Sequence, residues 1–297
     1  MKPRVVHRND VYVAQSANAV TGEVPYWDEA STALWWVDIQ GQRLIGHRPA
    51  DDGMIVHNLP SMPGMLTGRR SGGMVIGLED GLYAADPDSG LGAKLIDVES
   101  DKPLNRINDG KADARGRLWF GTLDKTGQFL PQGALYRLDL DGSLAKVRAD
   151  MRIPNAIDFS PDGKRMYVAD SHERRIDVMD YDLSAGVAGQ PRPFLETPDG
   201  TLPDGCCIDA EGAMWVAIIG GGRVERRLPD GSLHTIVELP VSRPTMPMLG
   251  GPDGRTLFVT CQRRLLGPEA LKREPLSGSL IAVRVEVPAR MIQLAAV

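Results

Sequence analysis

Short apolar runs recur along the chain at a nearly constant interval. Each run consists mainly of β-prone apolar residues and is too short for a helix, which is typical of a strand buried on both faces. The six runs are Leu34–Asp38, Met74–Leu78, Leu118–Thr122, Met166–Asp170, Met214–Ile218 and Leu257–Cys261. The second residues of successive runs lie 40, 44, 48, 48 and 43 positions apart. A strand-containing repeat of about 45 residues predicts the blades of a β-propeller.

Turns and amphipathic strands surround these runs. Sequences such as SPDGKR and GPDGRT precede a run, and segments such as GLYAADP and ALYRLDL follow one. We therefore predict an all-β, six-bladed propeller in a single domain over residues 1–297. Residues near Val5–Val13 and Ile281–Val287 are expected to share one blade and close the ring. A two-domain β-sandwich is the alternative, but its strands recur every ~8–12 residues without a longer period.

Composition narrows the class of protein further. The 33 Gly and 22 Pro are about one residue in five of 297, which favours many turns over a helical bundle. The net charge of -5 and the lack of a basic cluster argue against a nucleic-acid partner. No apolar stretch approaches the ~18–20 residues of a membrane span, and no signal peptide is evident. We expect a soluble, cytoplasmic protein without a membrane partner, as a monomer or weak homo-oligomer.

The three cysteines indicate no disulfide framework. Cys206 and Cys207 are adjacent, Cys261 stands alone, and an odd count of this kind is typical of a reducing compartment. We interpret the adjacent pair as small core residues in an inner strand, in preference to a thiol nucleophile.

Equivalent positions of four blades carry oxygen-bearing side chains. Counting back 11 or 12 residues from the second residue of a run reaches Glu23, Asn108, Asn155 and Asp204. These positions lie where the innermost strand of each blade begins, so we expect them to converge at one mouth of the central channel. Two carboxylates and two amides would repel one another or stay unpaired without a cation. The all-oxygen set suits Ca²⁺, Mg²⁺ or Mn²⁺, although a catalytic site also accepts Zn²⁺.

The corresponding places in blades two and six read SMPGML and PTMPML. They predict an apolar, methionine-rich wall of the mouth formed by Met65, Met246 and Met248. A few polar groups facing an apolar wall are typical of a small-molecule site.

The motifs GEVPYWD, RINDGKADARGRLWFGT, PNAIDFSPDGKRMYVADS and PDGCCIDAEGAMWVAIIGGGRV are specific in their order and spacing. Over nearly the whole chain the sequence resembles the senescence-marker-protein/regucalcin/gluconolactonase family of six-bladed propeller lactonases. The resemblance implies one divalent metal ion held by Glu23, Asn155 and Asp204, and substrate contacts from Arg106, Asn108 and Asp124. The family typically has Glu near the position of Asp124.

The expected reaction is the opening of a lactone ring by metal-activated water. The substrate expected from the resemblance is an aldonolactone of the gluconolactone or xylonolactone type, which yields the aldonic acid. Asp204 is the candidate catalytic base, because a carboxylate beside the metal can take the proton of the water. Arg106 has directional donors for ring hydroxyls or developing charge. The methionine wall favours a less polar lactone or ester as an alternative substrate.

The sequence alone is also compatible with other classes of function. A serine hydrolase is disfavoured because the chain lacks the GxSxG elbow. A non-enzymatic, calcium-binding regulatory propeller would keep Glu23, Asn155 and Asp204 without needing Arg106. A protein-interaction propeller would need no inward acids. The long loop Asp124–Gly133 is expected to cover the site, and His172 is expected in a solvated loop.

Overall fold

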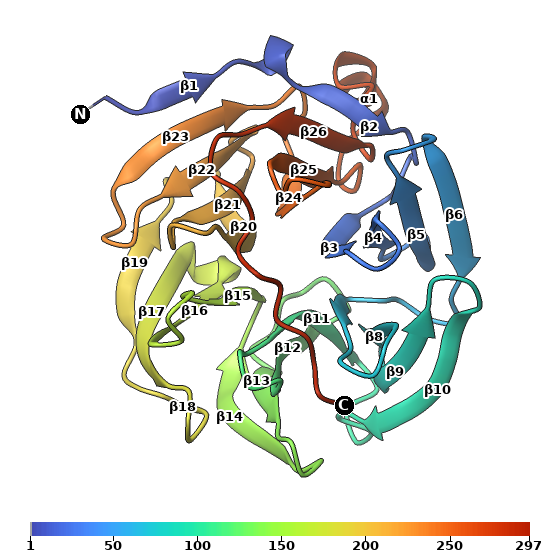
Figure 1. Cartoon of the computed structure of the whole chain (residues 1–297), viewed down its shortest axis with the longest axis vertical. Helices are drawn as coiled ribbons and strands as arrows, with labels where there is room; N and C mark the ends of the chain where they lie inside the picture. The colour runs from blue at the N-terminus through green and yellow to red at the C-terminus, as the bar shows by residue number, and fades with distance from the viewer. Residues whose placement is uncertain (1) are drawn as a thin grey trace.

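The computed structural model describes residues 2–297 and arranges them as six β-sheets, the blades, around a central axis (Figure 1). Blades one to three contain β3 (Gly22–Asp28), β4 (Ala33–Asp38), β5 (Arg43–Arg48) and β6 (Gly53–Asn58); β7 (Met65–Gly68), β8 (Met74–Gly77), β9 (Gly81–Asp86) and β10 (Gly90–Asp97); and β11 (Asn105–Ala112), β12 (Leu118–Asp124), β13 (Gly133–Leu138) and β14 (Leu144–Met151). The predicted all-β, six-bladed, single-domain propeller is confirmed.

Blades four to six complete the ring. They contain β15 (Pro154–Phe159), β16 (Arg165–Asp170), β17 (Arg175–Asp182) and β19 (Arg192–Glu196), with β18 (Val187–Ala188) beside β17; β20 (Leu202–Ile208), β21 (Met214–Ile219), β22 (Arg223–Arg227) and β23 (Leu233–Glu238); and β24 (Pro244–Gly250), β25 (Thr256–Cys261) and β26 (Leu280–Arg284). The helical segments in residues 2–297 are the short η1 (Arg8–Asp10), η2 (Ser171–Glu173) and α1 (Pro268–Arg273). None of the described residues form a helix long and apolar enough to cross a membrane.

The amino terminus divides between two blades. Strand β2 (Tyr12–Gln15) pairs antiparallel with β26 and completes blade six, as the sequence predicted. Strand β1 (Arg4–Val6) instead pairs parallel with β23 on the outer edge of blade five. The expectation that the whole of Val5–Val13 joins the carboxyl-terminal strand is therefore wrong for Val5. The 3-10 turn η1 separates the two strands and lets the chain step from one blade to the next.

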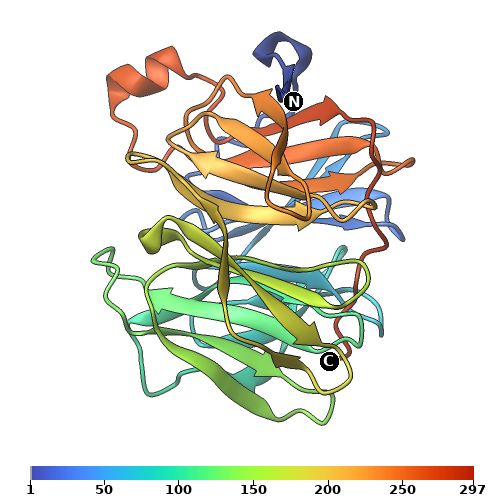
Figure 2. The same ribbon diagram turned by 90° about the vertical axis from the view of Figure 1, so that its left-hand side faces the viewer.

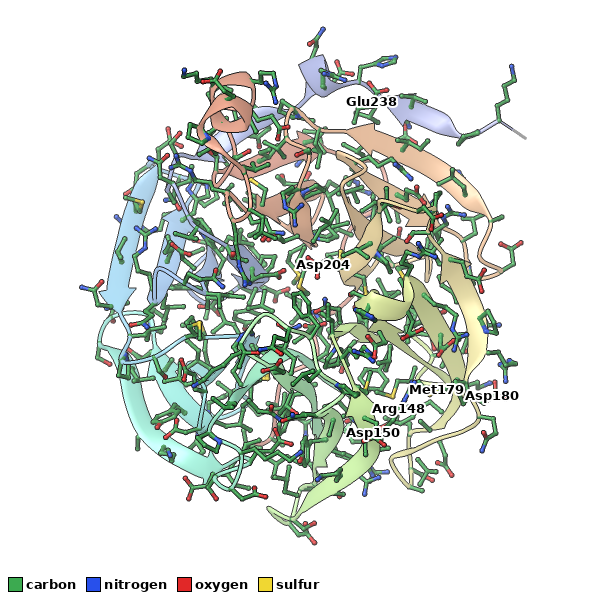
Figure 3. All side chains as sticks on the ribbon, turned by 180° about the vertical axis from the view of Figure 1, so that it is seen from behind. Arg148, Asp150, Met179, Asp180, Asp204 and Glu238 are labelled. Atoms are coloured by element: carbon green, nitrogen blue, oxygen red, sulfur yellow. The ribbon has the colours of Figure 1, made fainter. Side chains whose placement is uncertain are left out.

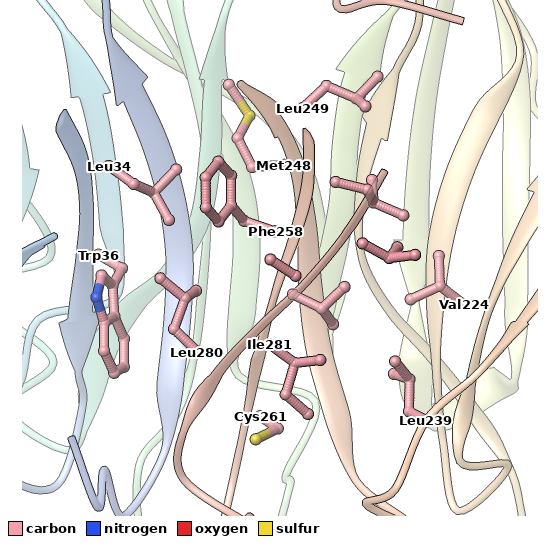
Figure 4. Packing of buried hydrophobic residues seen from close by; sticks show 14 of the residues in the cluster. Leu34, Trp36, Val224, Leu239, Met248, Leu249, Phe258, Cys261, Leu280 and Ile281 are labelled. Carbon is pink, nitrogen blue, oxygen red and sulfur yellow. The ribbon is translucent and has the colours of Figure 1, made fainter. Parts of the chain in front are cut away.

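The repeated apolar runs form the second strand of each blade. Strands β4, β21 and β25 are buried along their whole length, because neighbouring blades cover both of their faces. The outer strand β6 alternates between half-buried and exposed positions, because one of its faces meets solvent. Figure 4 shows the packing between blades, where side chains such as Trp36, Phe258 and Leu280 belong to one apolar cluster. Burial of this size is the main term stabilising the ring.

The carboxyl-terminal residues 286–297 cross one end of the central channel (Figure 1). The amide of Ala289 donates to the carbonyl of Gly254 in blade six at 2.8 Å. Further along, the amide of Ala295 donates to the carbonyl of Gly68 in blade two at 2.9 Å. Figure 2 shows this segment on the opposite face from α1. The segment thus ties blades on both sides of the ring and leaves the other mouth of the channel to the site.

Deletion of residues 289–297 is expected to destabilise the propeller without preventing its folding. The deletion removes Arg290, whose guanidinium pairs with the buried carboxylate of Asp158. An uncompensated buried charge of this kind costs roughly 3 kcal/mol or more. The urea midpoint should fall accordingly, and Asp158→Asn in the truncated chain should recover part of the loss. An unchanged midpoint after truncation would show that the segment contributes no stability.

Candidate functional site

The four side chains predicted to converge do lie together at one mouth of the channel. Glu23, Asn108, Asn155 and Asp204 line the same cavity of about 110 Å³. Each comes from the innermost strand of a different blade, and each is less than a tenth exposed. Figure 3, which views the molecule from behind Figure 1, shows Asp204 near the centre of the ring. The radial arrangement therefore brings together residues scattered over most of the sequence.

In each of the four innermost strands that carry these side chains, a β-bulge lies at the site residue or directly after it. In β3 the register passes from Glu23 opposite Val37 to Tyr26 opposite Trp35, so one extra residue is accommodated. The same shift occurs in β11, β15, β20 and β24. Val24 and Ala156, which follow Glu23 and Asn155, have φ values of 40° and 49°. Left-handed backbone is strained for such residues, and its recurrence beside the site side chains indicates that it helps to position them.

A chain of hydrogen bonds orients the amides. The Asn108 Nδ2 donates to Asn155 Oδ1 at 2.7 Å, and Asn155 Nδ2 donates to Asp204 Oδ1 at 2.6 Å. Asn155 Nδ2 also donates to the Ser171 hydroxyl at 2.9 Å, and that hydroxyl donates to the carbonyl of Pro203. Asn155 thereby presents its amide nitrogen to Asp204 and its amide oxygen to Asn108.

The two carboxyl groups lack a cationic partner at ion-pair distance. Within residues 2–297, no Lys, Arg or His nitrogen lies within 4.0 Å of the carboxylates of Glu23 or Asp204. Burial, followed by the negative charge of Asp204, raises the pKa of Glu23 well above its ordinary value. Burial and the charge of Asp109 raise the pKa of Asp204 to about 7, although Arg243 and Arg106 act in the opposite direction. The charge of Asp204 thus disfavours the ionised form of Glu23, whereas Glu23 lowers the pKa of Asp204.

A divalent cation suits this set of donors. Glu23 and Asp204 supply two carboxylates without an ion-pair partner, and Asn155 has an amide oxygen; all three residues lie on strands. Oxygen ligands of this type are those of hard cations such as Ca²⁺, Mg²⁺ and Mn²⁺. In residues 2–297 no group of three or more His, Cys, Asp or Glu side chains has the spacing of a metal site. Any site here therefore depends on the amide as well as on the two acids.

Arg106 lies in the cavity beside these groups. It is almost fully buried, and its Nη1 donates to the carbonyl of Ile107 at 2.8 Å. Burial and then the positive charge of Arg264 lower the pKa of Arg106 to about 10, while Glu23 raises it. The guanidinium thus stays charged at neutral pH and retains donors for a ligand.

Asp124 occupies a different position from the other predicted residues. It does not appear among the residues lining the cavity. Its carboxylate accepts hydrogen bonds from the amide and hydroxyl of Thr126, at 3.0 and 2.8 Å, and from the amide of Leu130 at 3.3 Å. Burial raises the pKa of Asp124, but these hydrogen bonds outweigh it and hold the value below the ordinary one. The structure gives Asp124 a role in shaping its own loop, and Phe129 of that loop lines the cavity.

The expected methionine wall is wrong. Met65, Met246 and Met248 are buried between blades and do not line the cavity. Met246 lies against Gly205 of blade five, where an added Cβ would meet its Cγ at 2.4 Å. Met248 packs beside Phe258 in the apolar cluster formed by blades five, six and one (Figure 4). In β24 the bulge and the alternation of side chains along the strand turn Met246 and Met248 into the core.

Polar and cationic residues take the place of that wall. Blade six contributes Arg243, Thr245, Gln262 and Arg264 to the cavity. The fixed count along the repeat gives Met246 in place of Thr245, because the hairpin between β24 and β25 is longer than those of the other blades. Arg243 directly precedes β24, and Arg264 follows β25 in the loop that opens on the same mouth. The signal in the sequence that could have indicated this cationic side is an arginine directly before β24 and another in the loop after β25.

The remaining candidate residues and grooves lie outside the cavity that holds Glu23 and Asp204. His172 is exposed and does not line the cavity, in agreement with a solvated loop. Cys206 and Cys207 are buried free thiols, and burial raises the pKa of Cys207 to about 12. Neither cysteine has the lowered pKa of a nucleophilic thiol. Two larger grooves of about 520 and 570 Å³ adjoin the carboxyl-terminal segment on the opposite face, but they lack the convergent buried donors of the cavity.

The fold and the site define a six-bladed propeller with a buried acid and amide cluster at one mouth of its channel. The chain belongs to the family described as SMP-30/gluconolactonase/LRE-like, whose model matches residues 21–263.

Individual relatives share most of their length with the chain. It is 35% identical over 276 residues to 6-deoxy-6-sulfogluconolactonase of Pseudomonas putida, covering 91% of this chain and 93% of the relative. It is 35% identical over 272 residues to regucalcin of Oryctolagus cuniculus, covering 90% and 91%. The solved structure of a calcium-binding protein, regucalcin, from Agrobacterium tumefaciens matches with a TM-score of 0.93 and 32% identity over 100% of both chains.

Proposed function

We propose that this protein is a metal-dependent lactonase that opens an aldonolactone ring to the corresponding aldonic acid. The single observation that carries the proposal is the convergence of two buried carboxylates and two amides, without ion-pair partners, beside Arg106. Membership of a family that includes a 6-deoxy-6-sulfogluconolactonase supports the same reaction.

A divalent cation held by Glu23, Asn155 and Asp204 would polarise a carbonyl oxygen and make a water more acidic. Asp204 accepts the proton of the water as its oxygen adds to the lactone carbonyl carbon. The ring C–O bond then breaks, and Asp204 returns the proton to the departing ring oxygen, which becomes a hydroxyl. The water is thereby consumed and one hydroxy acid is formed.

The other polar side chains orient the substrate. The Arg106 guanidinium donates to ring hydroxyls or to the oxyanion that develops at the carbonyl. The Asn108 Nδ2 is engaged by Asn155 and by the carbonyl of Pro154, which leaves its oxygen as an acceptor for a substrate hydroxyl. The direct test is a pH-stat assay of aldonolactones, before and after chelation and with added cations. We expect the cation-loaded protein to hydrolyse an aldonolactone and the chelated protein to hydrolyse none. If the cation-loaded protein hydrolyses none of the aldonolactones, the proposal is contradicted.

A calcium-binding regulatory protein is the second candidate. The pair of buried carboxylates favours it as much as it favours the enzyme, and a solved relative is described as a calcium-binding protein, regucalcin. A purely regulatory site has no need for a buried arginine with free donors beside the cation. Arg106 therefore favours the enzyme.

Asp124→Asn is expected to act through the loop and not through the chemistry. The substitution weakens the acceptor for Thr126 and Leu130, so Phe129 should lose its fixed position over the cavity. KM should rise about threefold to tenfold while kcat changes less than twofold. Asp141→Asn, in an exposed turn, is the matched control. A kcat loss of a hundredfold with unchanged KM would instead show that Asp124 acts on the reacting centre.

A further inference from the structure

Three arginines line one cavity. Arg106 comes from blade three, and Arg243 and Arg264 come from blade six. Arg264 reaches across the mouth, because its Nη2 lies 3.7 Å from the position that a Cβ on Gly127 would occupy. The cavity therefore carries cationic side chains on two sides.

Arg106 is buried and Arg243 and Arg264 are half-buried, and all three differ from the buried Arg117 and Arg226 in their partners. Arg117 pairs with Asp113 at 3.0 Å, and Arg226 pairs with Asp209 at 2.8 Å. Within residues 2–297, no carboxylate oxygen lies within 4.0 Å of a side-chain nitrogen of Arg106, Arg243 or Arg264. The Nε of Arg243 is buried and has no hydrogen-bond partner in that range. A buried charged donor without a partner is costly, so this nitrogen favours an anionic ligand group at the cavity.

The arginines also repel one another. Burial lowers the pKa of Arg106 and of Arg243, and the positive charge of Arg264 lowers both further, although Asp204 and Glu274 raise that of Arg243. Their backbones are nevertheless fixed: the carbonyl of Arg243 accepts from the amide of Gln262, and the amide of Arg264 donates to the carbonyl of Val20. The positive charges are held together by the fold and not by contacts between the side chains.

The balance of charge favours an anionic ligand group. The cavity carries three arginines against the carboxylates of Glu23 and Asp204. A divalent cation between those two carboxylates would balance them, and three positive charges would remain. A neutral polyol needs donors and acceptors but no such excess of positive charge. Guanidinium groups are suited to carboxylate, sulfonate and phosphate oxygens.

We propose that the lactone bears an anionic substituent, a carboxylate, sulfonate or phosphate, that Arg243 and Arg264 bind on the blade-six side of the cavity. The inference rests on the proposed lactonase function and deepens it by naming the substrate class. Arg106 remains at the reacting end of the ring, near Glu23 and Asp204.

Paired substrates test this inference. D-Glucono-1,4-lactone and D-glucaro-1,4-lactone share a five-membered ring and differ at carbon 6, which is a hydroxymethyl group or a carboxylate. The 6-phosphate and 6-deoxy-6-sulfo derivatives of D-glucono-1,5-lactone, compared with the parent lactone, identify which anion is preferred. We expect kcat/KM to be at least tenfold higher for one anionic member than for its neutral counterpart. Equal or lower values for all anionic members would overturn the inference.

Substitutions of the two blade-six arginines test whether these residues cause the preference for anionic lactones. Arg243→Gln and Arg264→Gln should each reduce the anionic-to-neutral ratio of kcat/KM at least tenfold, while Arg264→Lys keeps it within threefold. Arg263→Gln is the matched control, because Arg263 donates to Asn18 at 3.0 Å and does not line the cavity. Equal losses on both substrates in the Gln variants would overturn the assignment of these residues.

A binding measurement separates the anion site from the lactonase reaction. If no lactone is hydrolysed, calorimetric titration of the cation-loaded protein with glucarate and gluconate still measures the charge preference. At least tenfold tighter binding of glucarate, lost in Arg243→Gln, would support the anion site and reject only the reaction. Equal binding of the two acids would reject the anion site.

Discussion

Asp204→Asn is expected to remove lactone hydrolysis, with kcat falling by about a thousandfold or more, the effect typical of losing a key charge at a reacting centre. The substitution keeps the size of the side chain and its position beside Asn155, but it removes the proton acceptor and one of two anionic ligands. Glu23→Gln should abolish activity by weakening cation binding, with partial rescue at high cation concentration.

The fold should survive both substitutions. Removing one of two adjacent buried charges relieves repulsion, so the cation-free Asp204→Asn variant should be at least as stable as the parent. Asp162→Asn is the matched control, because Asp162 only supports a hairpin turn on the opposite face, where it accepts from the amide of Lys164. Steady-state assays and urea unfolding of all three variants give the comparison. Near-normal turnover by Asp204→Asn would contradict the assigned role of the carboxylate.

The second large effect is expected in the pH dependence of stability. In the cation-free protein, the free energy of unfolding should fall as pH rises from about 4 through about 7. The pKa of Asp204 is raised from 3.8 to about 7, so between these values the folded state holds a proton that the unfolded state has lost. A raised carboxyl pKa therefore stabilises the fold at low pH and no longer does so above about 7. Roughly three pH units at about 1.4 kcal/mol each give ~4 kcal/mol for this group.

A bound cation should reverse this trend, because it competes with protons for the same carboxylates. Urea unfolding between pH 5 and 8, with chelator and with saturating Ca²⁺ or Mn²⁺, measures both slopes. Asp204→Asn is the control, since it removes most of the difference between the two slopes and leaves the other titrating groups in place. Parallel slopes with and without cation in the parent protein would show that the carboxylates do not bind it.

The repeat pattern was sufficient to predict the architecture. Each buried second strand reads as a continuous apolar run because blades cover both of its faces, and the spacing of the runs gives the number of blades. The convergence of Glu23, Asn108, Asn155 and Asp204 followed from the radial symmetry alone. The path of β1 to the edge of blade five was missed, because a short, exposed edge strand carries little pattern.

The spacing of the repeats does not give the direction of individual side chains. The hairpin between β24 and β25 is longer than its counterparts, since Phe258 pairs with Met248 whereas Trp35 pairs with Tyr26, so a fixed count placed Met246 where Thr245 lines the cavity. The cationic side of the site depends on Arg243 and Arg264, which lie outside the regular strands. Asp124 follows the expected sequence position but turns toward its own loop, because the amides of that loop are its nearest donors.

The most direct measurement is the titration of chelated protein with Mn²⁺ or Ca²⁺ while aldonolactone hydrolysis is recorded in a pH-stat. Activity should be absent in the chelated protein and should rise to a plateau at one equivalent of cation for each chain. The same titration of Asp204→Asn should remain flat. Full hydrolysis by the chelated parent protein would contradict the account.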